Sequence, residues 1–308
     1  MATMRLTVNI TKWRIFRLSL PIFFSNLAIP LVGIVDTGLM GHMENEKFLI
    51  AVSISTTFLT MIFWSFGFLR MGTVGLISQA LGKADYRELV YIIIRNIFIA
   101  IFISILLIIL KPLLLHFLNQ IFTTSVKTKG YIDEYISIRI FSAPAELIAY
   151  VLIGFYLGIQ KTLTSSLLII ISSLLNIILS IYFVRELNLN VSGVALGTLL
   201  AFYITIIIFS IYTYFFIIRK FKVIPRLSNK SILNYKKILK LLNINFNIFI
   251  RTILLTFSFF WISYLGSTLG EEYIAINSIL IQLILISSFF LDAYAFSTES
   301  IVGYSIGR

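Results

Sequence analysis

Asp36 is a carboxylate inside the apolar run "LVGIVDTGLMGHM" (residues 31–43), which belongs to a segment long enough to cross a bilayer. A charged Asp at a helix centre costs about 2.5 to 3.5 kcal/mol on insertion scales, and each Leu or Ile returns roughly 0.3 to 0.6 kcal/mol. The segment can therefore insert despite Asp36. Such a residue usually faces the protein interior, where its protonation can be coupled to another event. Asp36 lies nineteen residues beyond Arg17, so the helix rise places it in the outer third of the membrane.

A second polar set is predicted at the same depth. Asn176 and Ser180 are one helical turn apart on one face, and Ser180 lies nineteen residues beyond Lys161. Together with Asp36 they could line one outward-open cavity and hold a coupling ion. A lone carboxylate with nearby oxygens suits either a proton or sodium. The alternative is that these are unrelated polar residues buried against their neighbours.

Two prolines, Pro21 and Pro30, precede Asp36 in the same segment. Proline removes a backbone donor and kinks a helix, which frees carbonyls and permits bending. A kinked helix that carries an ionisable group is a candidate moving part. The alternative is that a transmembrane helix simply tolerates proline.

Further charged residues are candidates for a cavity or a gate. Arg70 is predicted toward the inner end of its helix, at a depth similar to that of Asp292, and Glu299 follows Asp292 by two turns on the same face. A contact between Arg70 and a carboxylate could form an inner gate, whereas Arg70 and Glu299 could instead extend to the interface. Glu146 and Arg251 complete the set; for Glu146 the alternative is a role in helix packing or near a loop.

The residues give little support for an enzyme. The chain contains no cysteine, which excludes disulfides and thiolate metal sites. His42 and His116 are solitary, and H-E-x-x-H, G-x-S-x-G, Walker A and Rossmann motifs are missing from the sequence. We therefore expect no catalytic residues, no cofactor other than a coupling proton or sodium ion, and no metal site beyond sodium at Asp36.

The composition determines which elements must position these residues. Of 308 residues, 59% are hydrophobic and 12% are charged, and the mean hydropathy is +0.99, which is typical of a polytopic membrane protein rather than a soluble domain. The net charge of +12 is compatible with nucleic acid, but no soluble domain remains to bind it. The basic residues are better explained as loop charges beside a lipid bilayer.

A transmembrane helix needs about 20 apolar residues. Eight segments qualify, and they are residues 18–41, 48–71, 90–115, 134–159, 163–184, 193–218, 245–268 and 274–299. The connections on one side carry seventeen Lys and Arg and those on the other side carry five. This asymmetry predicts a multi-pass protein of the cell (inner) membrane with both termini in the cytoplasm.

The longest polar interval, residues 219–240, is basic and contains no acid. It divides the chain into a six-helix lobe (1–218), a cytoplasmic linker (219–240) and a two-helix piece (241–308). The linker is expected to anchor the chain at the inner surface; a lipid-headgroup or partner site is the alternative.

The two-helix piece resembles the start of the lobe. "FLIAVSISTT" (48–57) is similar to "YIAINSILIQ" (273–282), and "GLISQALGK" (75–83) is similar to "SIVGYSIGR" (300–308), at offsets of 224 and 225. The pattern predicts parallel repeats related by an axis along the membrane normal. The second copy stops where its third helix would begin, so we expect a separately encoded C-terminal remainder or a truncated gene.

Several stretches resemble one family. "SLPIFFSNLAIPLVGIVDTGLMGHM", "FLRMGTVGLISQALGK", "FSAPAELIAYVLIGFYLGIQ", "NIILS", "VSGVALGT" and "FLDAYAFSTESIVGYSIGR" are, in this order, similar to the multidrug and toxic compound extrusion (MATE) family, especially its DinF-like branch. The resemblance implies twelve helices in two lobes, of which this chain has the first eight. It also implies export of organic cations or other amphipathic compounds, driven by inward flow of protons or sodium.

The resemblance assigns Asp36 as the coupling carboxylate and Asn176 as its polar partner. The family often has an Asp one turn after that Asn, whereas this chain has Ser180. Two other functions stay open. A lipid-linked saccharide flippase should line its cavity with several Arg and Lys residues, and only Arg70, Arg139 and Arg251 lie within segments. The chain could also be a non-transporting remnant.

Overall fold

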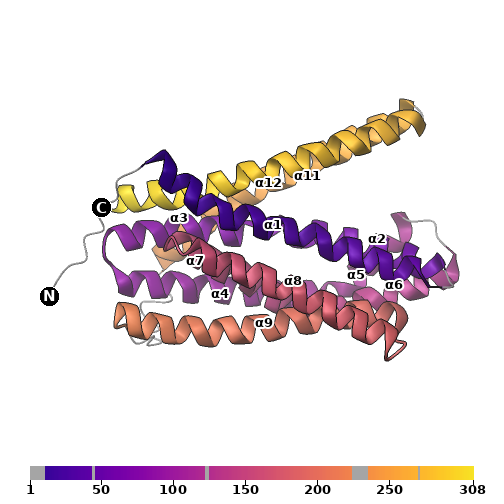
Figure 1. The fold of residues 1–308 in the computed structure, drawn as a ribbon, viewed down its shortest axis with the longest axis horizontal. Coiled ribbons are helices and arrows are strands. Elements are labelled where there is room, and N and C mark those ends of the chain that lie inside the picture. The colour runs from indigo at the N-terminus through magenta and orange to yellow at the C-terminus, as the bar shows by residue number, and fades with distance from the viewer. Residues whose placement is uncertain (1–10, 44–45, 122–124, 224–234, 270) are drawn as a thin grey trace.

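The protein is described by a computed structural model that covers residues 11–43, 46–121, 125–223, 235–269 and 271–308, and all regular structure in these ranges is helical (Figure 1). The helices are α1 (Lys12–Gly41), α2 (Glu46–Ser65), α3 (Phe68–Gly82), α4 (Tyr86–Ile109), α5 (Lys111–Ile121), α6 (Val126–Arg139), a 3-10 turn η1 (Ile140–Ser142), α7 (Ala143–Gly158), α8 (Thr162–Arg185), α9 (Asn190–Phe221), α11 (Tyr235–Leu269) and α12 (Glu271–Gly307).

The predicted all-α polytopic membrane fold is confirmed. Within the described ranges, six stretches are long and apolar enough to cross a membrane: Lys12–Gly41, Glu46–Gly82, Tyr86–Ile109, Val126–Gly158, Thr162–Arg185 and Asn190–Phe221. The other two predicted segments fall inside α11 and α12, which have 35 and 37 residues. Each predicted segment thus corresponds to helix, although several boundaries differ.

The second predicted segment ends too early, because the helical path continues past residue 71 to Gly82. A short break separates α2 from α3, where the Phe66 and Gly67 amides donate to carbonyls three residues back, at 3.0 and 2.9 Å. These are 3-10-type bonds, which tighten a turn without ending the helical course. Hydropathy falls around Arg70, but α3 stays helical because it packs inside the protein.

Prolines divide two other predicted segments. Residues 90–115 contain the end of α4 at Ile109 and the start of α5 at Lys111, next to Pro112. Residues 134–159 contain α6, η1 and α7, and Pro144 lies in the first turn of α7. Proline fits a first helical turn, where its missing N–H has no intrahelical acceptor. By contrast, α1 continues as one helix through Pro21 and Pro30.

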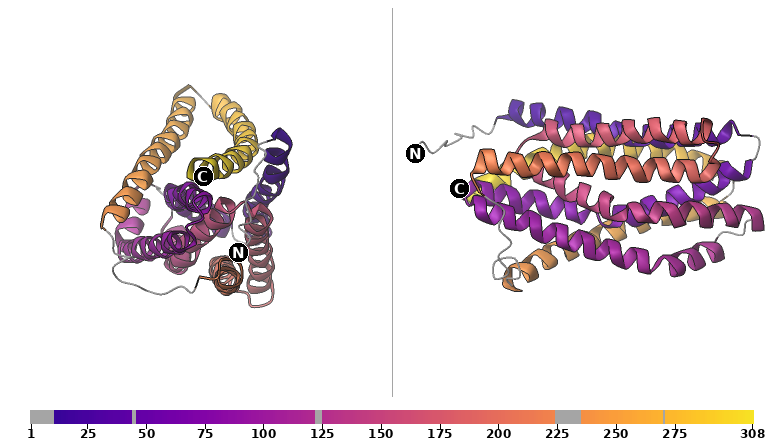
Figure 2. Two further views of the ribbon diagram at one scale, coloured as in Figure 1. Left: turned by 90° about the vertical axis from the view of Figure 1, so that its left-hand side faces the viewer. Right: turned by 90° about the horizontal axis from the view of Figure 1, so that it is seen from below.

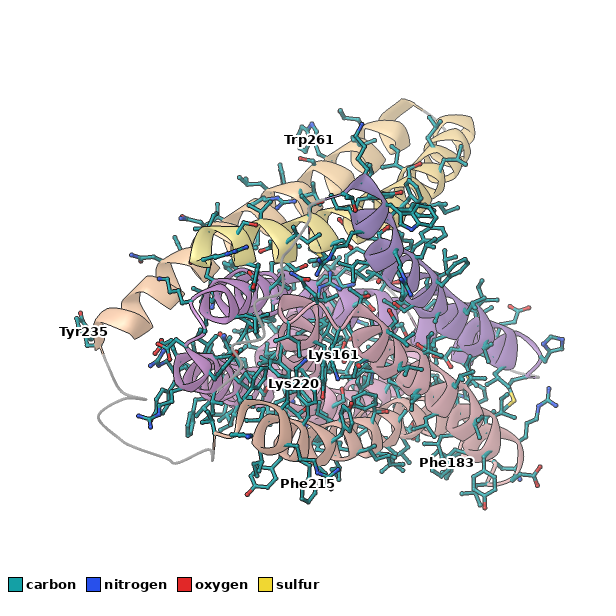
Figure 3. The ribbon with its side chains drawn as sticks, turned by 60° about the vertical axis from the view of Figure 1, so that its left-hand side comes forward. Lys161, Phe183, Phe215, Lys220, Tyr235 and Trp261 are labelled. Atoms are coloured by element: carbon teal, nitrogen blue, oxygen red, sulfur yellow. The ribbon has the colours of Figure 1, made fainter. Side chains whose placement is uncertain are left out.

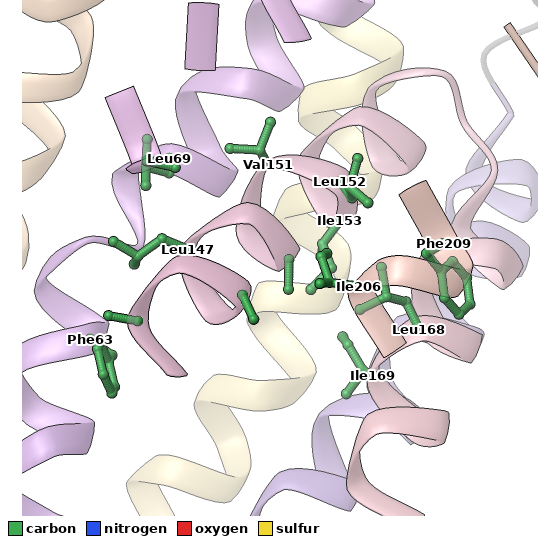
Figure 4. Packing of buried hydrophobic residues seen from close by; sticks show 14 of the residues in the cluster. Phe63, Leu69, Leu147, Val151, Leu152, Ile153, Leu168, Ile169, Ile206 and Phe209 are labelled. Atoms are coloured by element: carbon green, nitrogen blue, oxygen red, sulfur yellow. The ribbon is translucent and has the colours of Figure 1, made fainter. Parts of the chain in front are cut away.

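The centre of the fold is α7, which is buried on nearly every side. It contacts α3, α4, α8 and α9, and Figure 4 shows Leu147, Val151 and Ile153 of α7 packed among side chains of these neighbours. A helix that is apolar all round is a core helix. Gly154 allows α3 to come close, because a Cβ there would lie 2.6 Å from the Arg70 carbonyl oxygen.

A contact between α3 and α12 joins the two repeats (Figure 1, Figure 2). Built Cβ atoms at Gly82, Gly303 and Gly307 would collide with Tyr304, Ser78 and Gln79, respectively. The repeat offset of 225 relates Gln79 to Tyr304 and Gly82 to Gly307. The Gly82–Tyr304 contact in one direction therefore corresponds to the Gln79–Gly307 contact in the other. Reciprocal contacts of this kind are expected at a two-fold axis, and small residues let membrane helices approach closely.

The two ends of the molecule differ in how closely α11 and α12 approach the other helices. The start of α1 and the ends of α3, α9 and α12 lie at the end that carries the C-terminus, here called the C-terminal end (Figure 1). Toward the opposite end, α11 and α12 diverge from α1. Near the middle, α12 still touches α1 through Phe290 and Phe23, whose ring centroids are 5.5 Å apart.

Candidate ion-coupling site

Asp36 lies near the last turns of α1, on the side that packs against α8. Only 4% of the residue is exposed, and its Oδ1 atom has no hydrogen-bond partner among the described residues. A buried ionised carboxylate is costly unless it is paired or binds a cation. The site is therefore suited to hold a proton or a small cation on this oxygen.

Ser180 interacts with Asp36, and a hydrogen-bond network through Asn176 joins α8 to α9. The Ser180 hydroxyl donates to Asn176 Oδ1 at 3.0 Å, and Asn176 Nδ2 donates to the Thr198 hydroxyl at 3.2 Å. The Ser180 hydroxyl has one proton, which the bond to Asn176 uses. Gly197 permits this packing, since a Cβ there would lie 2.6 Å from Ser180 Oγ.

The structure thus brings the three predicted residues together, but in a different setting from the one expected. Asp36, Asn176 and Ser180 are 4%, 4% and 0% exposed, so they are buried between α1, α8 and α9 rather than lining an open cavity. A pocket of about 500 Å³ lies elsewhere, at the C-terminal end between α1 and α12, where Trp13, Phe16 and Tyr294 line it.

Arg139 is a charged neighbour of Asp36 to which the sequence assigned no role in the site. It is the last residue of α6, and its Nη2 atom lies 2.9 Å from Glu146 Oε2 at the start of α7. It also donates to the Ser142 hydroxyl, and its guanidinium lies over the Phe63 and Phe202 rings, at 5.3 and 5.5 Å from their centroids. The Arg139 charge also acts on Asp36.

Tyr135 and Thr198 are the other residues that the sequence prediction missed. Tyr135 lies one turn before Arg139, accepts a bond of 3.1 Å from the Thr56 hydroxyl and interacts electrostatically with Asp36 and Arg139. The signal that could have found Arg139 is its spacing of seven residues from Glu146, which places two opposite charges on one helix face. Tyr135 and Thr198 have no comparable signal, because isolated Tyr and Thr residues are common in membrane helices.

Of the candidate gate residues, Arg70, Asp292 and Glu299 lie nearer the C-terminal end, whereas Glu146 pairs with Arg139. Among the described residues, neither Asp292 nor Glu299 lies within ion-pair distance of Arg70. The Arg70 guanidinium instead lies 4.4 Å from the centroid of Phe296, and its Nε atom is buried without a partner in the described region. Phe296 is between the two acids on one face of α12, so its ring occupies the position where a carboxylate was expected.

Arg70 still interacts electrostatically with Asp292, Glu299 and Tyr150. Tyr150 also interacts with Glu146 and Arg139, and it is one turn from Glu146 on α7. Buried polar residues therefore run along α7 from the Asp36 site to the α3–α12 contact. Arg251 is exposed on α11, although its charge acts on Asp292.

The side chains near Asp36 suit a hard cation as well as a proton. They present carboxylate, amide and hydroxyl oxygens, which hard ions prefer to nitrogen or sulfur. Within the described ranges, no group of three or more His, Cys, Asp or Glu side chains is placed to hold a metal ion. The site fits one small monovalent cation better than a multiply charged metal, because Asp36 is its single carboxylate beside the Arg139–Glu146 pair.

Comparisons with known proteins identify the family of this chain. A family model described as MatE matches residues 21–182. DNA damage-inducible protein F of Escherichia coli (strain K12) is 31% identical over 298 residues, which cover 95% of this chain and 63% of that protein. Multidrug export protein MepA of Staphylococcus haemolyticus is 26% identical over 194 residues, which cover 63% of this chain and 43% of that protein.

Solved structures show the same fold. The outward-facing conformation of a multidrug resistance MATE family transporter of the MOP superfamily superposes with a TM-score of 0.84 at 20% identity, over 96% of this chain and 64% of that chain. A MOP superfamily transporter from Pyrococcus furiosus gives the same TM-score, identity and coverage. The predicted family resemblance is confirmed, and the chain belongs to the MatE family, whose members are transporters and not enzymes.

Proposed function

We propose that this chain acts in a secondary multidrug antiporter that exports organic cations or other amphipathic compounds in exchange for protons or sodium. The observation that carries this proposal is the buried Asp36 carboxylate, whose Oδ1 has no partner among the described residues while Arg139 and Ser180 lie nearby. A relative is named as a multidrug export protein. The family model matches residues 21–182, a range that includes Asp36.

Ion binding at Asp36 would change the charge that Arg139 experiences. Arg139 is held by Glu146 at the start of α7, and α7 packs directly on α3 near Arg70. A movement of Arg139 toward or away from Asp36 would therefore displace α7. Through α7, it would also change the contact between α3 and α12. Pro30 contributes on α1, because it leaves the Asn26 carbonyl without its usual helical donor and makes the helix easier to bend.

The chain spans 63% of the length of DNA damage-inducible protein F, so activity of the whole transporter is part of the proposal. We also propose that the protein resides in the inner membrane with both termini in the cytoplasm, as the charge asymmetry indicates. Apolar surfaces with few polar groups accept many amphipathic molecules, which suits a broad substrate range.

The saccharide flippase is less well supported by the contacts. Such a protein needs cations free to hold a pyrophosphate. Arg139 is paired with Glu146, Arg70 lies over Phe296, and Arg251 is on the exposed side of α11. These arginines therefore do not converge on one anion site.

The test is transport of a fluorescent cationic dye into vesicles that contain the purified chain and carry a pH or a sodium gradient. Asp36→Asn removes the ionisable group while keeping the side-chain size, so we expect it to abolish gradient-driven transport. Glu186→Gln is the matched control, because Glu186 is an exposed carboxylate that follows α8 at the same end of the molecule.

Equal transport by Asp36→Asn and the parent would reject the assigned role of Asp36. Loss of transport in Asp36→Asn, with normal transport by Glu186→Gln, would support the role of Asp36. The gradient that drives transport, of protons or of sodium, would identify the coupling ion. A folded parent without transport activity would favour the non-transporting remnant.

A further inference from the structure

Two lysines share one aromatic ring at the C-terminal end of the molecule. Lys161 Nζ lies 4.0 Å and Lys220 Nζ lies 5.5 Å from the centroid of Phe216. Lys161 is in the connection between α7 and α8, whereas Lys220 and Phe216 are in the last turns of α9. Figure 3 shows the two lysines close together on neighbouring segments. The fold therefore concentrates two positive charges on one small surface.

This concentration of charge is not balanced by an acid. Within the described ranges, neither lysine has a carboxylate within ion-pair distance, and the two ammonium groups repel each other. Partial burial lowers the pKa of Lys161 from its ordinary value, because the charged form loses solvation. The Phe216 ring offsets part of this cost through its negative face. A bound anion would offset the rest.

The backbone adds donors at the same place. Lys161 is the N-cap residue of α8, and its side chain makes no capping bond, so the first amides of this helix, directly after Lys161, have no side-chain acceptor. Helix N-termini favour anions, above all phosphate groups. Gln160, which precedes Lys161, is held by a bond of 2.7 Å from Arg14 to its Oε1 atom, so a third cation approaches this turn.

The surroundings indicate a membrane surface rather than open solvent. Lys161 lies between the end of one candidate span at Gly158 and the start of the next at Thr162. On α9, Tyr212 and Phe215 are 45% and 53% exposed, respectively, directly before Lys220. Exposed aromatic residues are typical of the level of lipid headgroups, and their rings provide an apolar surface for the upper part of an acyl chain.

We propose that Lys161 and Lys220, together with the first amides of α8, bind the phosphate group of an anionic phospholipid. The lipid phosphate would lie between the two ammonium groups at the membrane surface, and its chains would follow the exposed face of α9. Because the site is at the end opposite Asp36, this binding is independent of the proposed ion coupling.

The test is equilibrium binding of a fluorescent short-chain phosphatidylglycerol to the purified full chain in zwitterionic detergent. The same label on phosphatidylcholine is the lipid control, and inorganic phosphate is the competitor. We expect K161Q/K220Q to weaken phosphatidylglycerol binding about tenfold, since each basic residue near an anionic surface contributes to affinity. K161R/K220R should retain binding. The matched control K12Q/K83Q removes the same charge from two exposed lysines at this end that do not share a ring.

An equal loss of phosphatidylglycerol binding in K161Q/K220Q and K12Q/K83Q would overturn the proposal, because it would show diffuse attraction of the lipid to a basic surface. Equal binding of the two lipids, or full displacement of phosphatidylglycerol by inorganic phosphate at cellular concentration, would also overturn it. Selective loss in K161Q/K220Q, with an unchanged thermal midpoint of unfolding, would support it. None of these readouts uses transport.

Discussion

At the scale of single residues, the Arg139–Glu146 pair is the contact whose loss should cost most. Both side chains are almost fully buried at 11% exposure, and their charged atoms are 2.9 Å apart. Arg139→Met leaves the Glu146 charge buried without its partner, so we expect a loss of about 3 to 5 kcal/mol of unfolding free energy. The double variant R139M/E146L should recover most of that loss, because apolar residues of similar volume replace both charges.

The measurement is denaturant-induced or thermal unfolding of the purified protein in detergent. Glu186→Gln, at an exposed position, serves as the control and should stay within about 0.5 kcal/mol of the parent. If the single and double variants lost stability equally, packing rather than charge pairing would explain the effect. A stable R139M/E146L that has lost transport would place the pair in the coupling machinery.

The same residues show how much of the site the sequence could predict. Asp36, Asn176 and Ser180 were predicted to lie at one depth because charge positions fix the ends of α1 and α8, and the rise per residue is constant. Which faces of α6 and α9 turn toward them depends on tertiary packing, so Arg139, Tyr135 and Thr198 were missed. The sequence left the surroundings of Arg70 open for the same reason, because depth alone does not reveal that Phe296 lies between Asp292 and Glu299.

At the scale of helices, the close contact between α3 and α12 depends on glycines. A Cβ at Gly303 would collide with Ser78, whereas a Cβ at Gly33 on α1 would meet nothing within 4 Å. We therefore expect Gly303→Ala to push α3 and α12 apart and to cost about 1 to 3 kcal/mol, as overpacking does. Gly33→Ala should be neutral or stabilise by up to about 1 kcal/mol, because alanine is the better helix former.

Unfolding of both variants under one set of conditions checks this prediction. Equal stability of the two would mean that α3 and α12 can separate at no cost in free energy. The helices themselves were largely predictable, because apolar length is a local property. Their exact ends were less so, since the continuation of α3 to Gly82 depends on its packing against α12, which lies more than two hundred residues away in the chain.

At the scale of the whole molecule, the charges at its two ends predict its orientation. The C-terminal end carries Lys83, Arg87, Lys161 and Lys220, which lie at or beside helix ends, whereas the opposite end carries Lys47, Lys127 and Arg185. The excess of basic residues at the C-terminal end predicts that this end faces the cytoplasm. The same orientation would place Asp36 in the outer part of the membrane and the Lys161–Lys220 pair at the inner surface.

Because the chain has no cysteine, a single introduced cysteine reports on one position. Lys127, in the first turn of α6, and Lys83, directly after α3, are both exposed. A membrane-impermeant maleimide added to intact spheroplasts should label Lys127→Cys and leave Lys83→Cys unlabelled, and inverted vesicles should give the opposite pattern. Labelling of Lys83→Cys alone in spheroplasts would reverse the orientation. Asp36 would then face the cytoplasmic half of the membrane, and an inward ion gradient could not load it first from outside.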